Sequence, residues 1–211
     1  MKKRSLLSLL LVLALCLSLV SGALAAEGDT SAESAKIVIL STNDVHCAVA
    51  QTTDKDGNVT GMGYAALAAY ANKMKATYGE SNVTLVDAGD AVQGEAIGTL
   101  SKGEYLVDIL NKVGYAVRVP GNHEFDYGMD QFLALAKKTE SGYVSCNFIG
   151  KDGKPVFDAF KMISYGDVNV AYVGICTPET FFKSTPTYFQ DDKGNYIYGF
   201  CEGNDGADLY A

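Results

Sequence analysis

Apolar residues follow two alternating patterns along this chain, namely short, largely apolar runs and longer stretches with one apolar face. The short runs, each of strand length, lie at residues 37–40, 83–86, 115–119 and 143–148. The stretches with apolar residues at helical spacing lie at residues 62–78, 105–113 and 129–138. Short apolar runs are typical of strands buried on both faces. This β-α-β-α-β-α-β order predicts an α/β fold with a mostly parallel sheet, right-handed crossovers and helices on both faces.

The pattern changes after Gly150. Residues 157–164 and 168–175 both have strand character, and Tyr165-Gly166-Asp167 between them is a turn sequence. Such a pair predicts an antiparallel hairpin, which we expect to extend the sheet. Residues 187–211 are rich in Tyr, Asp, Gly and Asn and show no clear period.

The N-terminus has the pattern of a secretory signal peptide. Basic residues at 2–4 precede a mostly apolar run at 6–20, and Ala23-Leu24-Ala25 is a small-x-small cleavage site. A membrane anchor is the weaker interpretation, because the run is short for a span. We therefore expect a signal peptide over 1–25, a flexible lead-in over 26–35, a secreted or extracytoplasmic protein, and no membrane partner after cleavage.

Composition excludes one class of partner. The 211 residues carry a formal net charge of -8, and loss of the signal peptide would remove three further positive charges. Proteins that bind polymeric nucleic acid need basic surfaces, so we expect no such partner. Four cysteines follow the signal region, at positions 47, 146, 176 and 201, with spacing that matches no zinc-ribbon pattern. Cys146 and Cys176 lie in apolar runs and are expected to be buried.

Polar residues suited to metal binding follow three of the predicted strands. Asp44 and His46 come after the first strand, Asp90 after the second, and Asn122 after the third. The carboxyl ends of parallel strands meet at one edge of a sheet, where open α/β sheets place their ligands. Carboxylate, imidazole and amide ligands suit Zn, Mn, Fe or Co, and this mixed set favours two divalent ions that share Asp90.

The third loop, 121–128, carries further chemistry. His123 follows Asn122, and Asp126 lies three residues later. These two residues could form a carboxylate-oriented imidazole that stabilises a phosphoryl transition state or protonates a leaving alkoxide. Glu124 could orient His123 or cap the next helix, and the sequence leaves both interpretations open.

Each loop alone has an ordinary structural explanation. Asp44-Val45-His46 is more often a polar turn than a ligand pair, and Gly89-Asp90 is an ordinary strand end. Phe125 and Tyr127 are expected to pack beneath the loop. Cys47 could be a ligand, but a buried filler beside the loop is the favoured interpretation. The three loops together, at successive strand ends, make a purely structural explanation improbable.

The three motifs resemble those of the calcineurin-like metallophosphoesterase superfamily. Its D-x-H, G-D and G-N-H-E elements stand here as Asp44-Val45-His46, Gly89-Asp90 and Gly121-Asn122-His123-Glu124. The residues around these motifs are similar to those of the secreted 5'-nucleotidase branch, which includes UDP-sugar hydrolases and 2',3'-cyclic-nucleotide phosphodiesterases. The resemblance covers Lys36 to about Thr177 and implies a metallophosphoesterase-like β-sandwich core.

The resemblance also implies roles for individual residues. Asp44 and His46 would hold the first ion, Asp90 would bridge both ions, and Asn122 would hold the second. His123 and Asp126 would form a catalytic dyad. The implied function is hydrolysis of a nucleotide or other small phosphate ester by a metal-activated hydroxide that attacks phosphorus.

Two features depart from this family. Cys47 stands where the family usually has glycine. Family members also carry further metal-binding histidines and a C-terminal domain that binds the nucleotide base, whereas this sequence contains only two histidines. Residues 36–211 therefore resemble the N-terminal portion of such a domain, with the site incomplete at its C-terminal side. The alternative is a non-catalytic secreted fragment or binding module that retains the fold.

Overall fold

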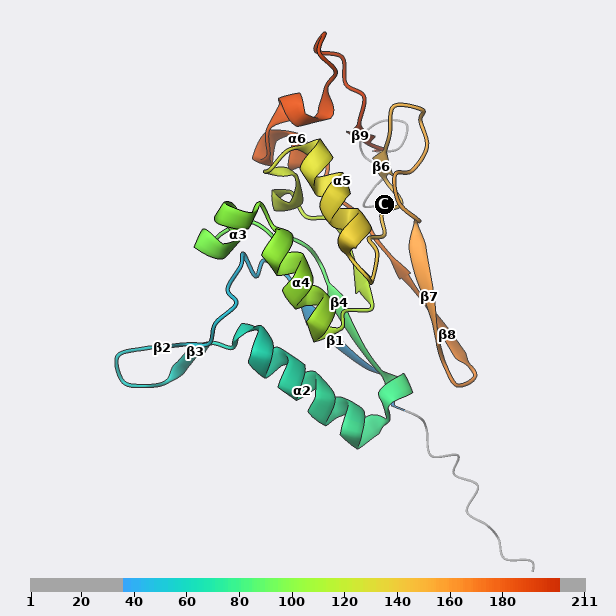
Figure 1. The fold of residues 1–211 in the computed structure, drawn as a ribbon. Helices are drawn as coiled ribbons and strands as arrows, with labels where there is room; N and C mark the ends of the chain where they lie inside the picture. Colours follow the sequence, from blue (N-terminus) through green and yellow to red (C-terminus); the bar gives the residue numbers. More distant parts are fainter. Residues whose placement is uncertain (1–35, 202–211) are drawn as a thin grey trace, which may run out of the picture. The chain divides into compact units, whose positions relative to one another are not determined.

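A three-stranded parallel sheet lies at the centre of the chain. The computed structural model describes residues 36–201, so the predicted signal peptide and the predicted lead-in lie outside the described residues. The sheet strands are β1 (Val38–Thr42), β4 (Val83–Asp87) and β5 (Val117–Arg118), in the order β1-β4-β5. Residues Val38 to Thr42 pair with Val83 to Asp87, and Val86 pairs with Val117. The sheet register therefore brings the ends of three strands to one edge (Figure 1).

Six helical elements accompany the sheet between residues 36 and 138. They are α2 (Gly63–Tyr78), η1 (Glu80–Asn82), α3 (Ala96–Ser101), α4 (Glu104–Val113) and α5 (Met129–Lys138), with a further short turn η2 (His123–Phe125) before α5. Apart from one-residue differences at its start, the predicted helix over 62–78 is confirmed, and α5 has the predicted bounds. The apolar side of α4 lies in the core because Leu106, Val107 and Leu110 are buried. The predicted α/β class is therefore confirmed.

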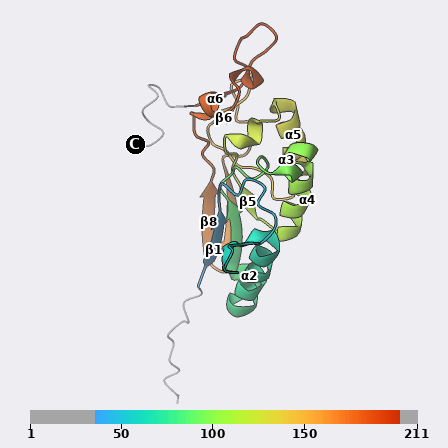
Figure 2. The ribbon, with the colours of Figure 1, turned by 90° about the vertical axis from the view of Figure 1, so that its left-hand side faces the viewer.

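The helices gather on one face of the sheet. Figure 2 shows α2, α4 and α5 on one side of the strands and β8 on the other. The hairpin of β7 (Phe160–Tyr165) and β8 (Val168–Val173) has the predicted antiparallel pairing. Tyr165 reaches the sheet by a hydrogen bond between its hydroxyl and that of Thr84. The hairpin forms a separate two-stranded sheet, so the expectation that it extends the parallel sheet is wrong. It lies on the face where the strand-helix alternation predicts helices, so the expectation of helices on both faces is also wrong.

The predicted fourth strand, 143–148, is wrong for most of its length. Only β6 (Phe148–Ile149) forms there, and it pairs with β9 (Gly199–Phe200) rather than with the parallel sheet. Val144 still donates its N–H to Arg118 O at 2.9 Å. Asn147 binds Cys176 through side-chain hydrogen bonds to its N–H and C=O, at 2.9 and 2.7 Å. The N–H groups of Ser145 and Cys146 bind two other segments, at Asp158 O and Gly174 O. The backbone bonds of this run therefore go to several partners instead of one ladder, and the Asn147 side chain holds its end.

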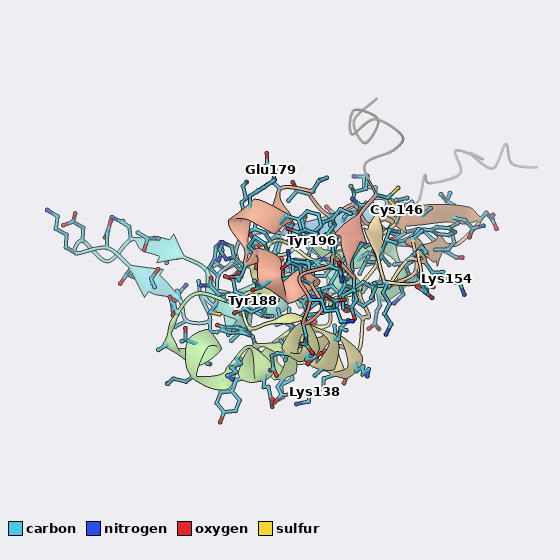
Figure 3. All side chains as sticks on the ribbon, turned by 90° about the horizontal axis from the view of Figure 1, so that it is seen from above. Lys138, Cys146, Lys154, Glu179, Tyr188 and Tyr196 are labelled. Carbon is cyan, nitrogen blue, oxygen red and sulfur yellow. The ribbon has the colours of Figure 1, made fainter. Side chains whose placement is uncertain are left out.

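The buried side chains form two clusters. The aliphatic cluster lies between the sheet and its helices, and its main members are Leu85, Val92, Leu106, Val107, Leu110 and Leu135. The aromatic cluster includes Phe125, Phe132, Tyr143, Phe148, Phe189 and Phe200, with Phe181 and Tyr188 packed against it. The last part of the described chain contributes α6 (Thr180–Lys183), η3 (Pro186–Phe189) and β9 to this second cluster. Tyr188 and Tyr196 mark this end in the view from above (Figure 3).

A small antiparallel ribbon completes the described chain. Its strands are β2 (Thr52–Thr53) and β3 (Val59–Gly61), joined by a turn in which Asp54 accepts hydrogen bonds from the N–H groups of Asp56 and Asn58. Within residues 36–201, no helix has both the length and the apolar character needed to cross a membrane.

Candidate metal centre

The loops after β1 and β4 run side by side. Asp44 N donates to Gly89 O at 3.0 Å, His46 N donates to Asp90 O at 2.9 Å, and Cys47 N donates to Ala91 O at 3.2 Å. These bonds continue the parallel pairing of the two strands beyond their ends. The sheet therefore delivers Asp44, His46 and Asp90 to one place, as the sequence predicts.

Three ligand-type side chains converge at this edge. One ligand atom each from His46, Asp90 and His123 lies within 4.8 Å of the other two. Asp44 is close to the group, with its Oδ1 3.8 Å from Nε2 of His46. Two ligands of one ion at about 2.1 Å each can be up to about 4.2 Å apart, and ligands shared with a second ion lie farther apart. Small side-chain movements would therefore accommodate divalent ions, and the nitrogen and oxygen donors suit Zn, Mn or Fe.

His46 is oriented by the neighbouring loop. Its Nδ1 lies 3.2 Å from Gln93 O. A backbone carbonyl at one ring nitrogen fixes the tautomer and turns the other nitrogen toward a metal. Nε2 is the nitrogen that faces Asp44, so the ring has the orientation a ligand needs. The carbonyl of Gln93 thus orients the imidazole, and no motif marks this contact in the sequence.

The backbone of these loops is held in an unusual conformation. Five residues other than glycine have positive φ in the described chain, and four of them lie in the two metal loops. These four are Asp44 (51°), His46 (46°), Cys47 (63°) and Asp90 (56°). Left-handed backbone at such residues costs on the order of 1 kcal/mol or more, and it gathers at functional sites. The packing of the surrounding loops must therefore maintain this arrangement.

Two glycines allow the loops to approach closely. A Cβ at Gly94 would overlap the carbonyl of His46, and one at Gly121 would overlap the carboxylate of Asp90. Only glycine lets a backbone come this near to its neighbour. Gly121 therefore explains how the loop after β5 reaches the side chain of Asp90, whose Oδ1 accepts the N–H of His123 at 2.8 Å.

His123 and Asp126 are in contact, as the predicted dyad requires. Nδ1 of His123 lies 2.6 Å from Oδ2 of Asp126, so the ring N–H donates to the carboxylate. Burial lowers the pKa of His123, but the hydrogen bond to Asp126 and the charges of Asp126 and Asp90 outweigh it and raise the pKa above its usual value. The imidazole rings of His123 and His46 lie edge to face, with centroids 5.0 Å apart.

Ser184 is a member of this site that sequence reasoning missed. Its Oγ donates to Oδ1 of Asp126 at 3.1 Å, so Asp126 is held from both sides. Ser184 lies 58 residues from Asp126 and directly follows α6. No motif marks it in the sequence, and only the approach of α6 to the third loop reveals it.

The structure decides the interpretations of Glu124 and Cys47 that the sequence left open. Glu124 is fully buried and neither binds the ring of His123 nor caps α5, whose N-cap makes no side-chain hydrogen bond. It accepts the N–H of Asp90 in the loop after β4 and the N–H of Gly121 in its own loop.

Cys47 is also fully buried, and burial raises the pKa of its thiol to about 11. Cys47 is absent from the ligand group, as the filler interpretation predicts.

A buried ion pair lies beneath the strand ends. Arg118 Nε donates to Asp87 Oδ2 at 3.1 Å, and neither side chain is exposed to solvent. Thr42 donates to the other oxygen of Asp87 at 2.8 Å, which links β1 to this pair. The Arg118 guanidinium lies 4.8 Å from the ring centroid of Tyr143. The three loops therefore stand on a polar layer that the sequence analysis did not identify.

Asn122 precedes η2 and lies directly before His123, whose N–H donates to Oδ1 of Asp90 in the loop after β4. The backbone therefore places Asn122 at the same edge as Asp90. Its role as a ligand stays a prediction.

Comparison with known protein families agrees with the geometry. The family model described as calcineurin-like phosphoesterase matches residues 37–194. The chain belongs to this family. Among its relatives, the chain is 34% identical over 166 residues to snake venom 5'-nucleotidase from Gloydius brevicauda, covering 75% of this chain and 28% of that protein. It is 32% identical to the 5'-nucleotidase of Bos taurus, covering 72% and 28%.

A solved structure supports the fold. The putative 5'-nucleotidase from Staphylococcus aureus matches with a TM-score of 0.64 at 21% identity, covering 72% of this chain and 31% of that one. This calcineurin-like phosphoesterase chain thus spans less than a third of the length of the two relatives and of this structure.

Proposed function

We propose that this chain is the metal-binding N-terminal part of an exported phosphoesterase that hydrolyses nucleotide phosphate esters. The convergence of His46, Asp90 and His123 within 4.8 Å is the observation that carries the proposal. Family membership and the 5'-nucleotidase relatives support nucleotides as the substrate class. The N-terminal basic and apolar pattern supports export. Residues 36–211 would form the first part of the phosphoesterase domain.

The ligand roles follow from the loops. Asp44 and His46 would hold one divalent ion, Asp90 would be shared, and Asn122 would contribute to a second. Ions bound there would act as Lewis acids toward the phosphoryl oxygens and lower the pKa of a water. Asp90 already accepts the N–H of His123 through Oδ1, which fixes its carboxylate plane before any ion binds.

The dyad supplies the proton chemistry. Asp126 binds Nδ1 of His123, so Nε2 is the nitrogen available to a substrate. A raised pKa keeps the imidazole protonated to a higher pH than usual. Protonated His123 could stabilise charge on the phosphoryl oxygens or donate a proton to the leaving alkoxide, the two roles that the sequence predicts.

The test is hydrolysis of AMP in Mn²⁺ or Zn²⁺ by the purified longer protein of which this chain would be the first part. We expect turnover to be abolished by Asp90→Asn and by His123→Ala. Asp167→Asn is the matched control, because Asp167 is exposed beside Tyr165, which contacts the start of β4 rather than its metal-binding end. Equal turnover in Asp90→Asn and the parent chain would refute the proposal.

A second function has a specific observation in its favour. The sequence contains two histidines, and both already lie in the cluster, so the sequence offers no further histidine as a ligand. A non-catalytic binding module that retains the fold would bind Mn²⁺ or Zn²⁺ but would not hydrolyse AMP. Calorimetric titration with each ion, run beside the AMP assay, therefore separates the two functions.

A further inference from the structure

Glu124 is a fully buried carboxylate in the loop after β5 that faces the loop after β4. Its Oε2 accepts the N–H of Asp90 at 2.8 Å and the N–H of Gly121 at 2.6 Å, and its Oε1 accepts the N–H of Ala91 at 2.9 Å. One side chain thus binds both segments that bear the candidate ligands Asp90 and Asn122.

The backbone ladder does not hold these segments together. Strands β4 and β5 pair through Asp87 and Arg118, and Val119 N donates to Asp87 O at 3.0 Å. Beyond this bond, no backbone-to-backbone hydrogen bond joins residues 88–94 to residues 120–126 in the described chain. The carboxylates of Glu124 and Asp90 provide the connections there.

The packing shows how closely the two segments must be held. A Cβ at Gly89 would overlap the backbone of Gly121, and Asp90 has a left-handed backbone with φ of 56°. An anion can accept several N–H groups at once and so stabilise loops that the ladder no longer controls. The charged partner of Glu124 in this region is the buried Arg118, whose own carboxylate contact is to Asp87.

We propose that Glu124 is a positioning residue that sets the affinity of the metal centre by fastening the Gly89–Ala91 segment to the Gly121–His123 segment. This inference rests on the proposed metal-binding function. Glu124 touches neither ion nor substrate; it acts through the backbone of Asp90 and Gly121. The residue fixes the distance between a shared ligand on one loop and a second-ion ligand on the other.

Glutamine at position 124 would test this role with almost no change in shape. A glutamine amide has one acceptor oxygen and one donor group, so at most two of the three N–H groups could be accepted. At least one N–H would then face an NH₂ group. Glu104→Gln is the matched control, because Glu104 is exposed and pairs with Lys138 on the surface.

The first measurement is the binding of Mn²⁺ and Zn²⁺ to the full chain by calorimetry, at a temperature where circular dichroism shows each variant folded. We expect Glu124→Gln to lower affinity by about 10- to 100-fold, as loss of outer-shell partners does elsewhere. Glu104→Gln should bind like the parent chain. A folded Glu124→Gln variant with parental affinity would reduce Glu124 to a structural residue and overturn the proposal.

The second measurement needs no variant. In the metal-free parent chain, hydrogen exchange followed by NMR should show protected amides at Asp90, Ala91 and Gly121, although all three lie in loops. Exchange at the rate of exposed loop amides would overturn the proposal, even if Glu124→Gln fails to fold. If the parent chain binds no metal but these amides are protected, the proposed function fails while the fastening by Glu124 stands.

Discussion

The two clusters of buried side chains differ in how the chain builds them. The aliphatic cluster joins neighbouring elements of the regular strand-helix alternation, mainly Leu85 of β4 with Leu106 and Leu110 of α4. The aromatic cluster joins short pieces that are far apart in sequence. Phe125 of η2 lies at its centre, with ring centroids 4.6 Å from Phe132 and 5.1 Å from Phe189.

Each cluster supports a different part of the candidate site. The loops with Asp44, His46 and Asp90 leave strands that pack on the aliphatic cluster. The dyad of His123 and Asp126 flanks Phe125, the central residue of the aromatic cluster. Asp44, His46 and Asp90 would therefore depend mainly on the aliphatic cluster, and the dyad mainly on the aromatic cluster, and this separation can be tested.

The largest expected effects come from matched truncations of the two clusters. Phe125→Ala should lower the free energy of unfolding by about 3–5 kcal/mol, and Leu106→Ala by about 2–5 kcal/mol, because both side chains are fully buried. Urea unfolding measures both. The chain has only two histidines, so NMR of their rings reports on the dyad directly. We expect Phe125→Ala to move the His123 signals and Leu106→Ala to leave them in place; the reverse result would break the comparison.

Metal ions should stabilise the folded chain by binding to the loops that leave the parallel sheet. At about 100 times the dissociation constant, Mn²⁺ or Zn²⁺ should add about 2.7 kcal/mol to the free energy of unfolding, by preferential binding to the folded state. Thermal unfolding with and without EDTA measures this difference. Asp90→Asn should lose most of it and Asp167→Asn should retain it. An equal metal effect in the Asp90→Asn variant would place the binding site elsewhere.

The dyad gives a smaller, pH-dependent effect. Because the pKa of His123 is raised in the folded chain, its interaction with Asp126 stabilises the fold below the unfolded histidine pKa of about 6.5 and is lost as pH rises through the folded pKa. In metal-free protein, Asp126→Asn should therefore destabilise more at about pH 5.5 than at about pH 9. Urea unfolding at the two pH values checks this, and equal destabilisation would contradict it. Ser184→Ala should show a weaker form of the same dependence.

The smallest expected effect is a difference in the reactivity of the thiols, which does not involve the free energy of unfolding. Cys47 and Cys176 are buried, and burial raises the pKa of their thiols to about 11 and about 12. Cys201 is exposed and free in the structure. Alkylation of native protein, mapped by mass spectrometry, should modify Cys201 and spare the two buried thiols until urea is added. Rapid modification of Cys176 would show that the region around the aromatic cluster opens readily.

The sequence by itself determined the α/β class, the bounds of α5, the hairpin and the three loops that carry the candidate ligands. These features depend on local periodicity and on the rule that parallel strands end at one edge, so nearby residues specify them. The tertiary structure alone decided that a hairpin faces the second side of the sheet, that the side chain of Asn147 binds the backbone of Cys176, that Ser184 holds Asp126, and that Glu124 joins the loops after β4 and β5. Each of these depends on partners at least 29 residues apart, and hydrogen bonds over such separations leave no periodic signal in the sequence.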